Sequence, residues 1–145
     1  LITGEVPGEE ARIAIGEHAA KVLGVKEVIN ETAVGPASSL SARSNDSYIT
    51  SKVKARLVDE KNISANHIKV VTENGIVYLM GIVTERESKV AVAVARTTEG
   101  VRKVINVMQV MSDAEIQRLS TFPSAGDSPA AAPQPAPQPA PVESR

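Results

Sequence analysis

The sequence contains no cysteine and no tryptophan, and only one phenylalanine and two tyrosines among its 145 residues. Without cysteine the chain cannot form a disulfide, and it offers neither a thiol nucleophile nor a thiolate ligand for a metal. With aromatic residues at 2%, a hydrophobic core has to be built from Val, Ile, Leu and Ala. These absences exclude thiol chemistry and predict a core of aliphatic side chains.

The sequence also lacks a long apolar run and a marked excess of charge. No stretch of about 18 apolar residues occurs, so no segment is predicted to cross a membrane as a helix. The net charge is −1, so any surface for a polyanion has to be local. The opening residues LITGEVP have neither the basic nor the apolar part of a signal peptide. We expect any export signal or anchor to lie upstream of them.

Residues suited to catalysis are sparse. His18 and His67 are the only histidines, and neither stands at the spacing of a metal-binding or catalytic motif. No G-x-S-x-G or P-loop motif occurs, and the G-x-x-G loop of a KH module is absent. We therefore expect no enzymatic activity, no metal, no other cofactor and no nucleic-acid partner.

One short pattern is written twice. The segment GVKEVIN begins at Gly24 and the segment GVRKVIN begins at Gly100, an offset of 76 (100 − 24). Around them, residues 1–34 align with residues 78–110, and the offset changes by one residue within the unit. The chain therefore holds two copies of one unit, which is a duplication and not a solenoid.

The repeated unit is predicted to be strand, helix, strand. In the first copy the helical face is formed by Ala11, Ile15, Ala19 and Val22, and the matching face of the second copy by Ser88, Ala91, Val94, Ala95 and Thr98. Gly24 and Gly100 stand where a left-handed residue would end each helix. The repeated motif is then a helix stop, a tight turn and a strand, which is scaffold and not a site.

The second copy has a further helix and strand before it. Asp46 or Ser47 is expected to cap a helix that runs to about Lys61, with Ile49, Val53 and Leu57 as its apolar stripe. Residues 67–72 are typical of a strand, and Asn74-Gly75 is a strong hairpin signal. The predicted fold is α+β, with the order α-β-β-α-β and a three-stranded mixed sheet packed against two helices, preceded by a partial β-α-β copy.

This organisation predicts four segments. Residues 1–34 (copy one) form a partial domain, residues 35–45 a linker of small residues, and residues 46–112 (copy two) a complete domain. Residues 113–145 are expected to be a disordered tail rich in Pro, Ala and Gln, because seven of the nine prolines lie in 123–145.

The remaining clue is local charge. The segment SYITSKVKARLV, residues 47–58, carries Lys52, Lys54 and Arg56 and no acidic residue. At its start Tyr48 has an amphipathic ring of the kind found at lipid headgroups. These features favour weak, reversible binding to an anionic bilayer. The same features also fit an ordinary surface helix whose tyrosine packs against the linker.

The predicted order of elements, the glycine within the strand LMGIV and the pattern G-V-x-x-V-x-N together resemble the BON domain. The resemblance covers residues 1–34 in part and residues 46–112 as a whole. The stretches SNDSYITSKVKARL and VVTENGIVYLMGIVTERE are similar to the dual-BON outer-membrane lipoproteins. The resemblance implies a non-enzymatic, periplasm-facing protein associated with the outer membrane, which supports membrane integrity during envelope stress.

The resemblance also implies a site. In the lipid-binding family members the first helix of the second BON domain binds anionic phospholipid, such as phosphatidylglycerol or cardiolipin. The corresponding residues here are Tyr48, Ser51, Lys52, Lys54, Ala55, Arg56 and Val58. The tyrosine, alanine and valine would contact the apolar part of the bilayer and the basic residues would pair with phosphates. The family typically has tryptophan where this chain has Tyr48.

Two alternatives stay open at this point. The chain could be a periplasmic adaptor that uses an open sheet edge and the proline-rich tail to contact outer-membrane assembly or cell-wall-remodelling proteins. It could also be an osmotic-stress protein without direct lipid binding.

Overall fold

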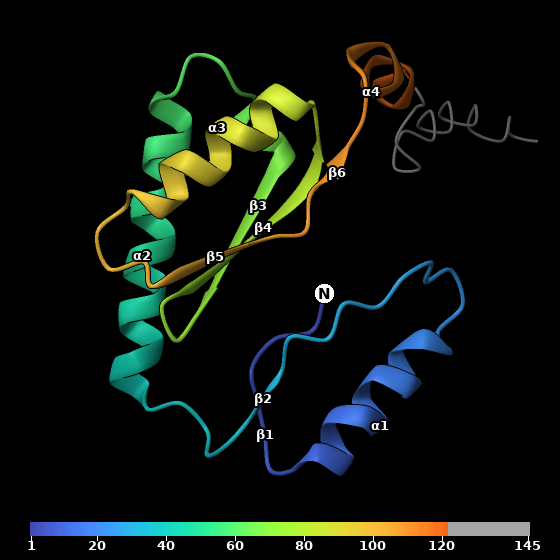
Figure 1. The fold of residues 1–145 in the computed structure, drawn as a ribbon, viewed down its shortest axis with the longest axis vertical. Helices are drawn as coiled ribbons and strands as arrows, with labels where there is room; N and C mark the ends of the chain where they lie inside the picture. The colour runs from blue at the N-terminus through green and yellow to red at the C-terminus, as the bar shows by residue number, and fades with distance from the viewer. Residues whose placement is uncertain (122–145) are drawn as a thin grey trace, which may run out of the picture.

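The structure, a computed structural model, describes residues 1–121, and the proline-rich stretch 123–145 lies outside the described residues (Figure 1). In chain order the elements are β1 (Glu5–Val6), α1 (Glu9–Ala20), β2 (Ala33–Val34), α2 (Leu40–Asp59), the 3-10 turn η1 (Ala65–His67), β3 (Ile68–Glu73), β4 (Ile76–Val83), α3 (Glu85–Arg96), β5 (Lys103–Asn106), β6 (Gln109–Val110) and α4 (Asp113–Ser120). The predicted α+β class and the order α-β-β-α-β of copy two are confirmed.

The sheet of copy two is built around β4. Strand β3 pairs with β4 antiparallel through the Asn74-Gly75 turn, in which both residues have positive φ (50° and 75°), as a tight hairpin turn requires. Strands β5 and β6 both pair with β4 in parallel at one offset of 27 (103 − 76 and 110 − 83). The predicted third strand is therefore present but split in two at residues 107–108.

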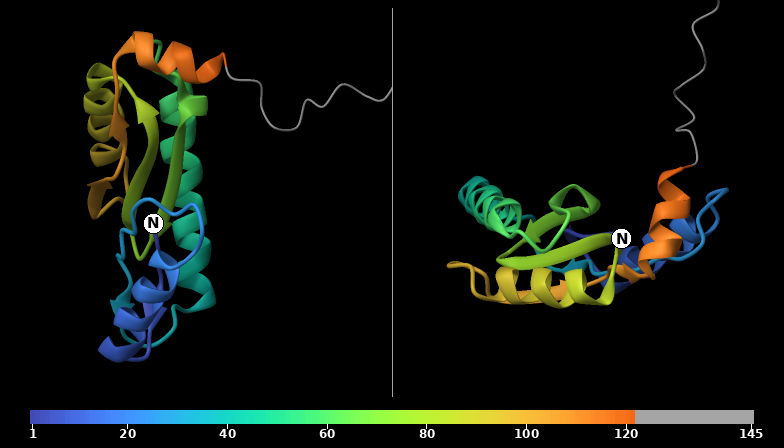
Figure 2. Two further views of the ribbon diagram at one scale, coloured as in Figure 1. Left: turned by 90° about the vertical axis from the view of Figure 1, so that its right-hand side faces the viewer. Right: turned by 90° about the horizontal axis from the view of Figure 1, so that it is seen from above.

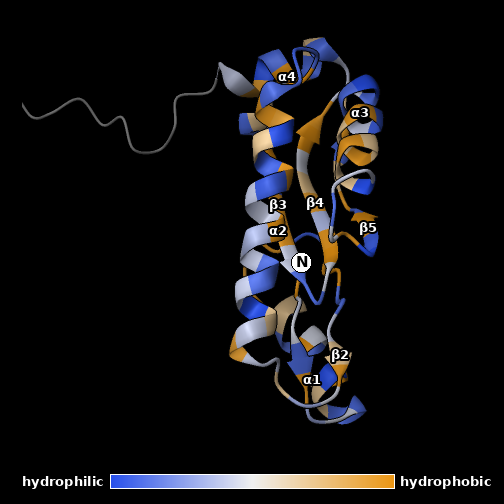
Figure 3. Ribbon diagram, turned by 90° about the vertical axis from the view of Figure 1, so that its left-hand side faces the viewer, coloured by the Kyte–Doolittle hydropathy of each residue, from blue (hydrophilic) through white to orange (hydrophobic). Residues whose placement is uncertain are grey.

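Helices α2 and α3 contact the sheet and each other, and strand β4 runs between them (Figures 2 and 3). The residues of this core are Ile49, Val53, Leu57, Ile68, Val70, Val77, Leu79, Val83, Ala91, Val94 and Ala95. The predicted stripe of α2 and most of the predicted face of α3 are thus confirmed as core. All eleven side chains are aliphatic, as the lack of aromatic residues led us to expect.

Helix α2 begins earlier than predicted. Its N-cap is Ser39, whose hydroxyl accepts a hydrogen bond from the Ala42 N–H at 3.2 Å, so residues 40–45 are helical and the expected cap at Asp46 or Ser47 is wrong. Asp46 lies inside the helix with 5% of its surface exposed. Its carboxylate accepts hydrogen bonds from the N–H groups of Asn74 (2.8 Å) and Gly75 (2.9 Å). Asp46 therefore holds the β3–β4 turn, a partner 28 residues away that local sequence reasoning cannot see.

A second correction concerns the start of the expected tail. Residues 113–120 form α4, which is closed at its start by a capping box in which the Ser112 hydroxyl accepts from the Glu115 N–H and the Glu115 carboxylate accepts from the Ser112 N–H. The S-x-x-E pattern carries this signal in the sequence. The part of the expected tail that the structure describes is thus largely helical.

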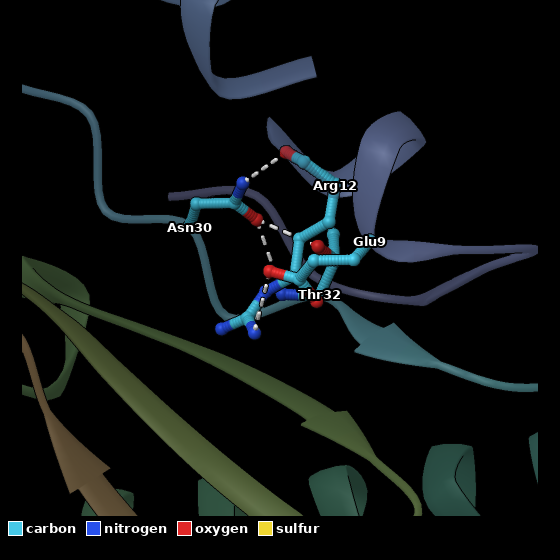
Figure 4. Close-up of polar contacts among 4 residues, drawn as sticks. All are labelled: Glu9, Arg12, Asn30 and Thr32. Carbon is cyan, nitrogen blue, oxygen red and sulfur yellow. Dashed lines mark hydrogen bonds and ion pairs between the residues drawn. The ribbon is translucent and has the colours of Figure 1, made fainter. Parts of the chain in front are cut away.

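The repeated asparagine has the same task in both copies. Asn30 accepts from the Thr32 N–H at 3.2 Å and donates to the Arg12 carbonyl of α1 at 2.7 Å (Figure 4). Asn106 likewise accepts from the N–H two residues on, that of Met108, and donates to the Ser88 hydroxyl of α3. Each asparagine ties its strand to the helix before it, which supports the interpretation of the motif as scaffold.

Copy one differs from copy two because nothing described takes the place of α2. Helix α1 is present as predicted, but it buries no residue. In its expected inward face Ile15 and Val22 are exposed. In copy two the corresponding positions of α3, Ala91 and Thr98, are buried. The helix prediction is confirmed, and the prediction of a buried face on α1 is wrong for the part of the chain that the structure describes.

Copy one lies close to the face of the sheet that α2 and α3 leave open. Asn74 donates to the Glu5 carboxylate at 2.6 Å. Burial raises the pKa of the Tyr78 hydroxyl, with added contributions from the charges of Glu31 and Glu73, and Tyr78 is 3% exposed. The two copies thus meet through polar and charged groups around the hairpin turn and the middle of β4.

At Gly81 the backbone of β4 lies very close to the backbone of His67. The φ of Gly81 is 144°, and an added Cβ would lie 2.0 Å from the His67 carbonyl oxygen. Gly81→Ala is expected to lower the free energy of unfolding by roughly 3 kcal/mol, from backbone strain and overpacking together. Gly4 is the matched control, because its φ is 117° but its Cβ would meet no atom within 4 Å. Gly4→Ala should lose about 1 kcal/mol in urea denaturation, and equal losses would contradict this account.

The contact between the copies predicts a pH dependence. Burial raises the pKa of Glu73, and the charges of Glu5 and Asp46 raise it further, against the lowering effects of Arg43 and Thr3. A raised folded-state pKa means that stability is greatest below the unfolded value and falls as the pH rises through the folded value. Glu73→Gln should therefore raise the melting temperature at pH 7, and the gain should vanish below about pH 4.

The control for this change is Glu27→Gln in the exposed segment between α1 and β2. It should leave the melting temperature unchanged at both pH values. A lower melting temperature for Glu73→Gln at pH 7 would show that the carboxylate is favourable where it stands.

Candidate functional site

The outward face of α2 exposes several apolar side chains. The inward stripe fixes the rotation of the helix, so the opposite side faces solvent. Leu40 and Val58 are 18 residues apart, which is five full turns, and therefore lie on one line along the helix. At about 100° per residue, Ser51 lies about 20° from that line around the helix axis, Ala55 about 60° and Tyr48 about 80°, all toward the side that carries Lys52. Leu40 is 85% exposed, Tyr48 61% and Val58 71%. We call Leu40, Tyr48, Ser51, Ala55 and Val58 the outer line of α2.

Two lysines flank the outer line on opposite sides. The Lys52 ammonium lies 4.8 Å from the centre of the Tyr48 ring, a cation–π contact, and 3.4 Å from the Glu99 carboxylate. Lys54 is exposed on the other side, where β3 runs alongside the helix. The structure thus brings one aromatic ring and one ammonium group together and leaves a second ammonium group free to meet solvent.

Arg56 is placed differently from the expectation. Its guanidinium donates to the Val94 carbonyl at 3.0 Å, to the Thr98 hydroxyl at 2.8 Å and to the Thr97 hydroxyl at 3.1 Å. These groups belong to the end of α3, where a cation is favourable to the helix dipole. Arg56 therefore links α2 to α3, and its main contacts are structural.

The small residues fit between these groups. Ser51 is exposed and its hydroxyl donates to the Ser47 carbonyl at 3.0 Å, so it leaves the outer line without a protruding side chain. Ala55 is also exposed. The result is a low, partly apolar ridge about 27 Å long at 1.5 Å per residue, with basic groups beside it.

Sequence reasoning missed Leu40. The prediction places Leu40 in the linker, although the Ser39 cap and the helix formers Leu40, Ala42 and Arg43 signal the start of a helix. The other residues expected at the site lie on the exposed sides of α2, except that Lys52 and Arg56 lean toward α3.

This arrangement suits contact with an extended surface. Within residues 1–121, no group of three or more His, Cys, Asp or Glu side chains could hold a metal ion. Over the same residues, no helix combines the length and the apolar character needed to span a bilayer. An exposed apolar ridge flanked by cations can lie on an interface that is apolar beneath and anionic above.

Comparison with known proteins adds three relatives. The BON domain family matches residues 1–36 and 45–112. The chain is 36% identical to the outer membrane lipoprotein DolP of Haemophilus influenzae over 111 residues, which are 77% of this chain and 58% of that protein. It is 36% identical to the 21 kDa hemolysin of Actinobacillus pleuropneumoniae over 74% of this chain and 56% of that protein.

The third relative matches a shorter part of the chain. Osmotically-inducible protein Y of Escherichia coli is 42% identical over 72 residues, which are 49% of this chain and 36% of that protein. The chain therefore spans little more than half the length of the first two relatives and about a third of this one.

The contacts of Arg56 predict a difference in stability between neighbouring basic residues. Arg56→Ala removes three hydrogen bonds to the end of α3 and should lower the free energy of unfolding by roughly 1–2 kcal/mol. Lys54→Ala is the control, because no hydrogen bond or ion pair holds its ammonium group in the described residues. It should change stability by less than about 0.5 kcal/mol. Equal effects in chemical denaturation would show that the Arg56 contacts add nothing.

Proposed function

The chain belongs to the BON domain family, and we propose that it is a cell-envelope protein that binds anionic phospholipid through the outer face of α2. Its likeness to DolP and to osmotically-inducible protein Y supports a place in the envelope. More specifically, we propose that the protein lies at the outer-membrane side of the periplasm. Its ligand would be phosphatidylglycerol or cardiolipin, and its role would be to support outer-membrane integrity.

The observation that carries the proposal is the outer line of α2. Tyr48 and Val58 are both more than half exposed although their side chains are largely apolar. Lys52 stands over the Tyr48 ring at 4.8 Å, so a phosphate that pairs with this lysine brings the ring to the headgroup boundary. Apolar contact and charge are thus available on the exposed side of one helix.

The strength of such binding follows from the groups present. Each basic residue near an anionic surface contributes roughly 1 kcal/mol. On α2 the exposed Arg43 and Lys54 are available together with Lys52, which also pairs with Glu99. A tyrosine and a valine at the interface add a modest apolar term. The charge contribution and the apolar contribution are both weak, so binding should be reversible and should depend on salt. Such binding fits a protein that associates with the membrane surface.

An adaptor role is the second candidate. Helix α1 exposes Ile13, and the turn that follows the helix exposes Val22 and Leu23, which gives copy one an exposed apolar surface. A protein partner in the envelope would bind such a surface with little dependence on salt or on α2. The two functions therefore make different predictions for variants of α2.

Vesicle binding tests the proposal. The chain should sediment with vesicles that contain phosphatidylglycerol or cardiolipin and not with phosphatidylcholine vesicles, and 0.5 M salt should release it. Tyr48→Ala and the double variant Lys52→Ala/Lys54→Ala should each weaken binding about tenfold, because they remove the ring or two charges.

Two variants provide controls of matched chemistry. Val110→Ser removes an apolar side chain that is also half exposed but lies on β6, and Lys61→Ala/Lys89→Ala removes two exposed lysines outside the outer line. Both should bind like the wild type. Equal and negligible binding of the wild type to both kinds of vesicle would overturn the proposal in favour of a protein partner.

A further inference from the structure

A basic cavity lies where α3 ends and β5 begins. It has a volume of about 400 Å³ and is lined by Arg96, Val101, Arg102, Lys103 and Val104. Three of its five lining residues are cationic and none is acidic. The volume is within the range of sites that hold small molecules.

The three cations of the cavity have no partner among the described residues. Neither a salt bridge nor a side-chain hydrogen bond within residues 1–121 involves Arg96, Arg102 or Lys103, whereas Arg56 and Lys52 nearby are both engaged. Like charges that converge without a counter-charge raise the free energy of the folded state. Their placement is therefore suited to a negatively charged group from outside the chain.

The duplication supplies an internal comparison. At the offset of 76, Arg96 corresponds to Ala20, Arg102 to Lys26 and Lys103 to Glu27. Copy one thus carries one basic and one acidic residue at these positions, while copy two carries three basic residues on the same helix-turn-strand. The shared fold of the repeat therefore does not require the three charges, and the cluster of three cations is found in copy two and not at the matching positions of copy one.

The cavity adjoins the flank of α2 that carries Lys52. The loop that joins its two sides, residues 97–100, runs beside α2 (Figure 1). Glu99 of this loop pairs with Lys52, and an added Cβ on Gly100 would lie 3.2 Å from Ile49. A lipid surface that contacts Tyr48 and Lys52 would therefore also lie near loop 97–100, which borders the cavity.

We propose that the cavity lined by Arg96, Arg102 and Lys103 binds the phosphate of an anionic phospholipid headgroup, as a second contact beside α2. The inference rests on the proposed function. Two guanidinium groups can each bind phosphate oxygens in pairs, and Lys103 adds a point charge. The cavity would add three cations to those that α2 presents to the bilayer, and it would provide a defined site for one phosphate group.

The test replaces cavity residues with those that copy one carries. Arg96→Ala/Lys103→Glu changes the charge by three units and should weaken binding to phosphatidylglycerol vesicles at least about tenfold at low salt. The control Arg118→Ala/Lys26→Glu makes the same change of three units at exposed positions on α4 and copy one, and should weaken binding less than threefold. An equal loss in both variants would mean bulk charge only and would overturn the cavity proposal.

NMR titration of the intact chain distinguishes the sources of phosphate and guards against a misfolded variant. Phosphatidylglycerol micelles should shift the amide signals of residues 101–104, zwitterionic micelles should not, and the Arg96→Ala/Lys103→Glu variant should keep its dispersed spectrum while losing the shifts. Equal shifts with inorganic phosphate alone would identify a site for free phosphate and overturn the lipid assignment.

The same data separate the two proposals. If Tyr48→Ala abolishes vesicle binding while the amides of residues 101–104 never respond to lipid, the α2 surface stands and the cavity proposal fails. If neither region responds to anionic lipid, the proposed function itself fails.

Discussion

The burial of one stripe of α2 against the sheet is the constraint on which the surface chemistry of the molecule depends. Ile49, Val53 and Leu57 are almost fully buried against β3, β4 and α3. Each buried aliphatic side chain contributes roughly 1.5–3 kcal/mol, so the rotation of the helix about its axis is strongly fixed. Tyr48 and Val58 then have no route into the core, and their exposure is a consequence of the fold.

The core also explains why the helix is rigid along its length. Asp46 ties its first half to the β3–β4 turn through two backbone hydrogen bonds, and Arg56 ties its second half to the end of α3. The exposed face of a helix held at both ends is already ordered. Binding to the proposed lipid surface would therefore cost less conformational entropy than ordering a loop.

The duplication separates what the unit needs in order to fold from what copy two has added. In both copies the repeated asparagine bonds to the preceding helix, and the glycine after that helix has a positive φ of 90°. By contrast, copy two adds a capping box at the start of α3 and the partner helix α2, and it has three cations near β5 where copy one has only Lys26. In a chain of net charge −1, such local concentration of cations gives an anionic surface a preferred side on which to approach.

Local patterns in the sequence determined the order of elements, the hairpin turn at Asn74-Gly75 and the inward stripe of α2, because each depends on neighbours within a few turns or residues. The exposure of Tyr48 and Lys54 follows from that stripe, because residues on the other side of the helix must face away from the core. The start of α2 and the presence of α4 can also be predicted from the sequence, since Ser39 and the Ser112–Glu115 pair carry ordinary capping signals.

Only the tertiary structure decided the roles of Asp46 and Arg56 and the existence of the basic cavity. Asp46 has the sequence signature of a helix cap, and its true partners lie 28 and 29 residues away. Arg56 belongs to the same basic run as Lys54, yet contacts with α3 about 40 residues later give it a structural task. The sequence by itself determined which side of each helix is apolar, because that depends on periodicity. Which charges meet a partner depends on distances between segments far apart in the chain, and folding alone brings those segments together.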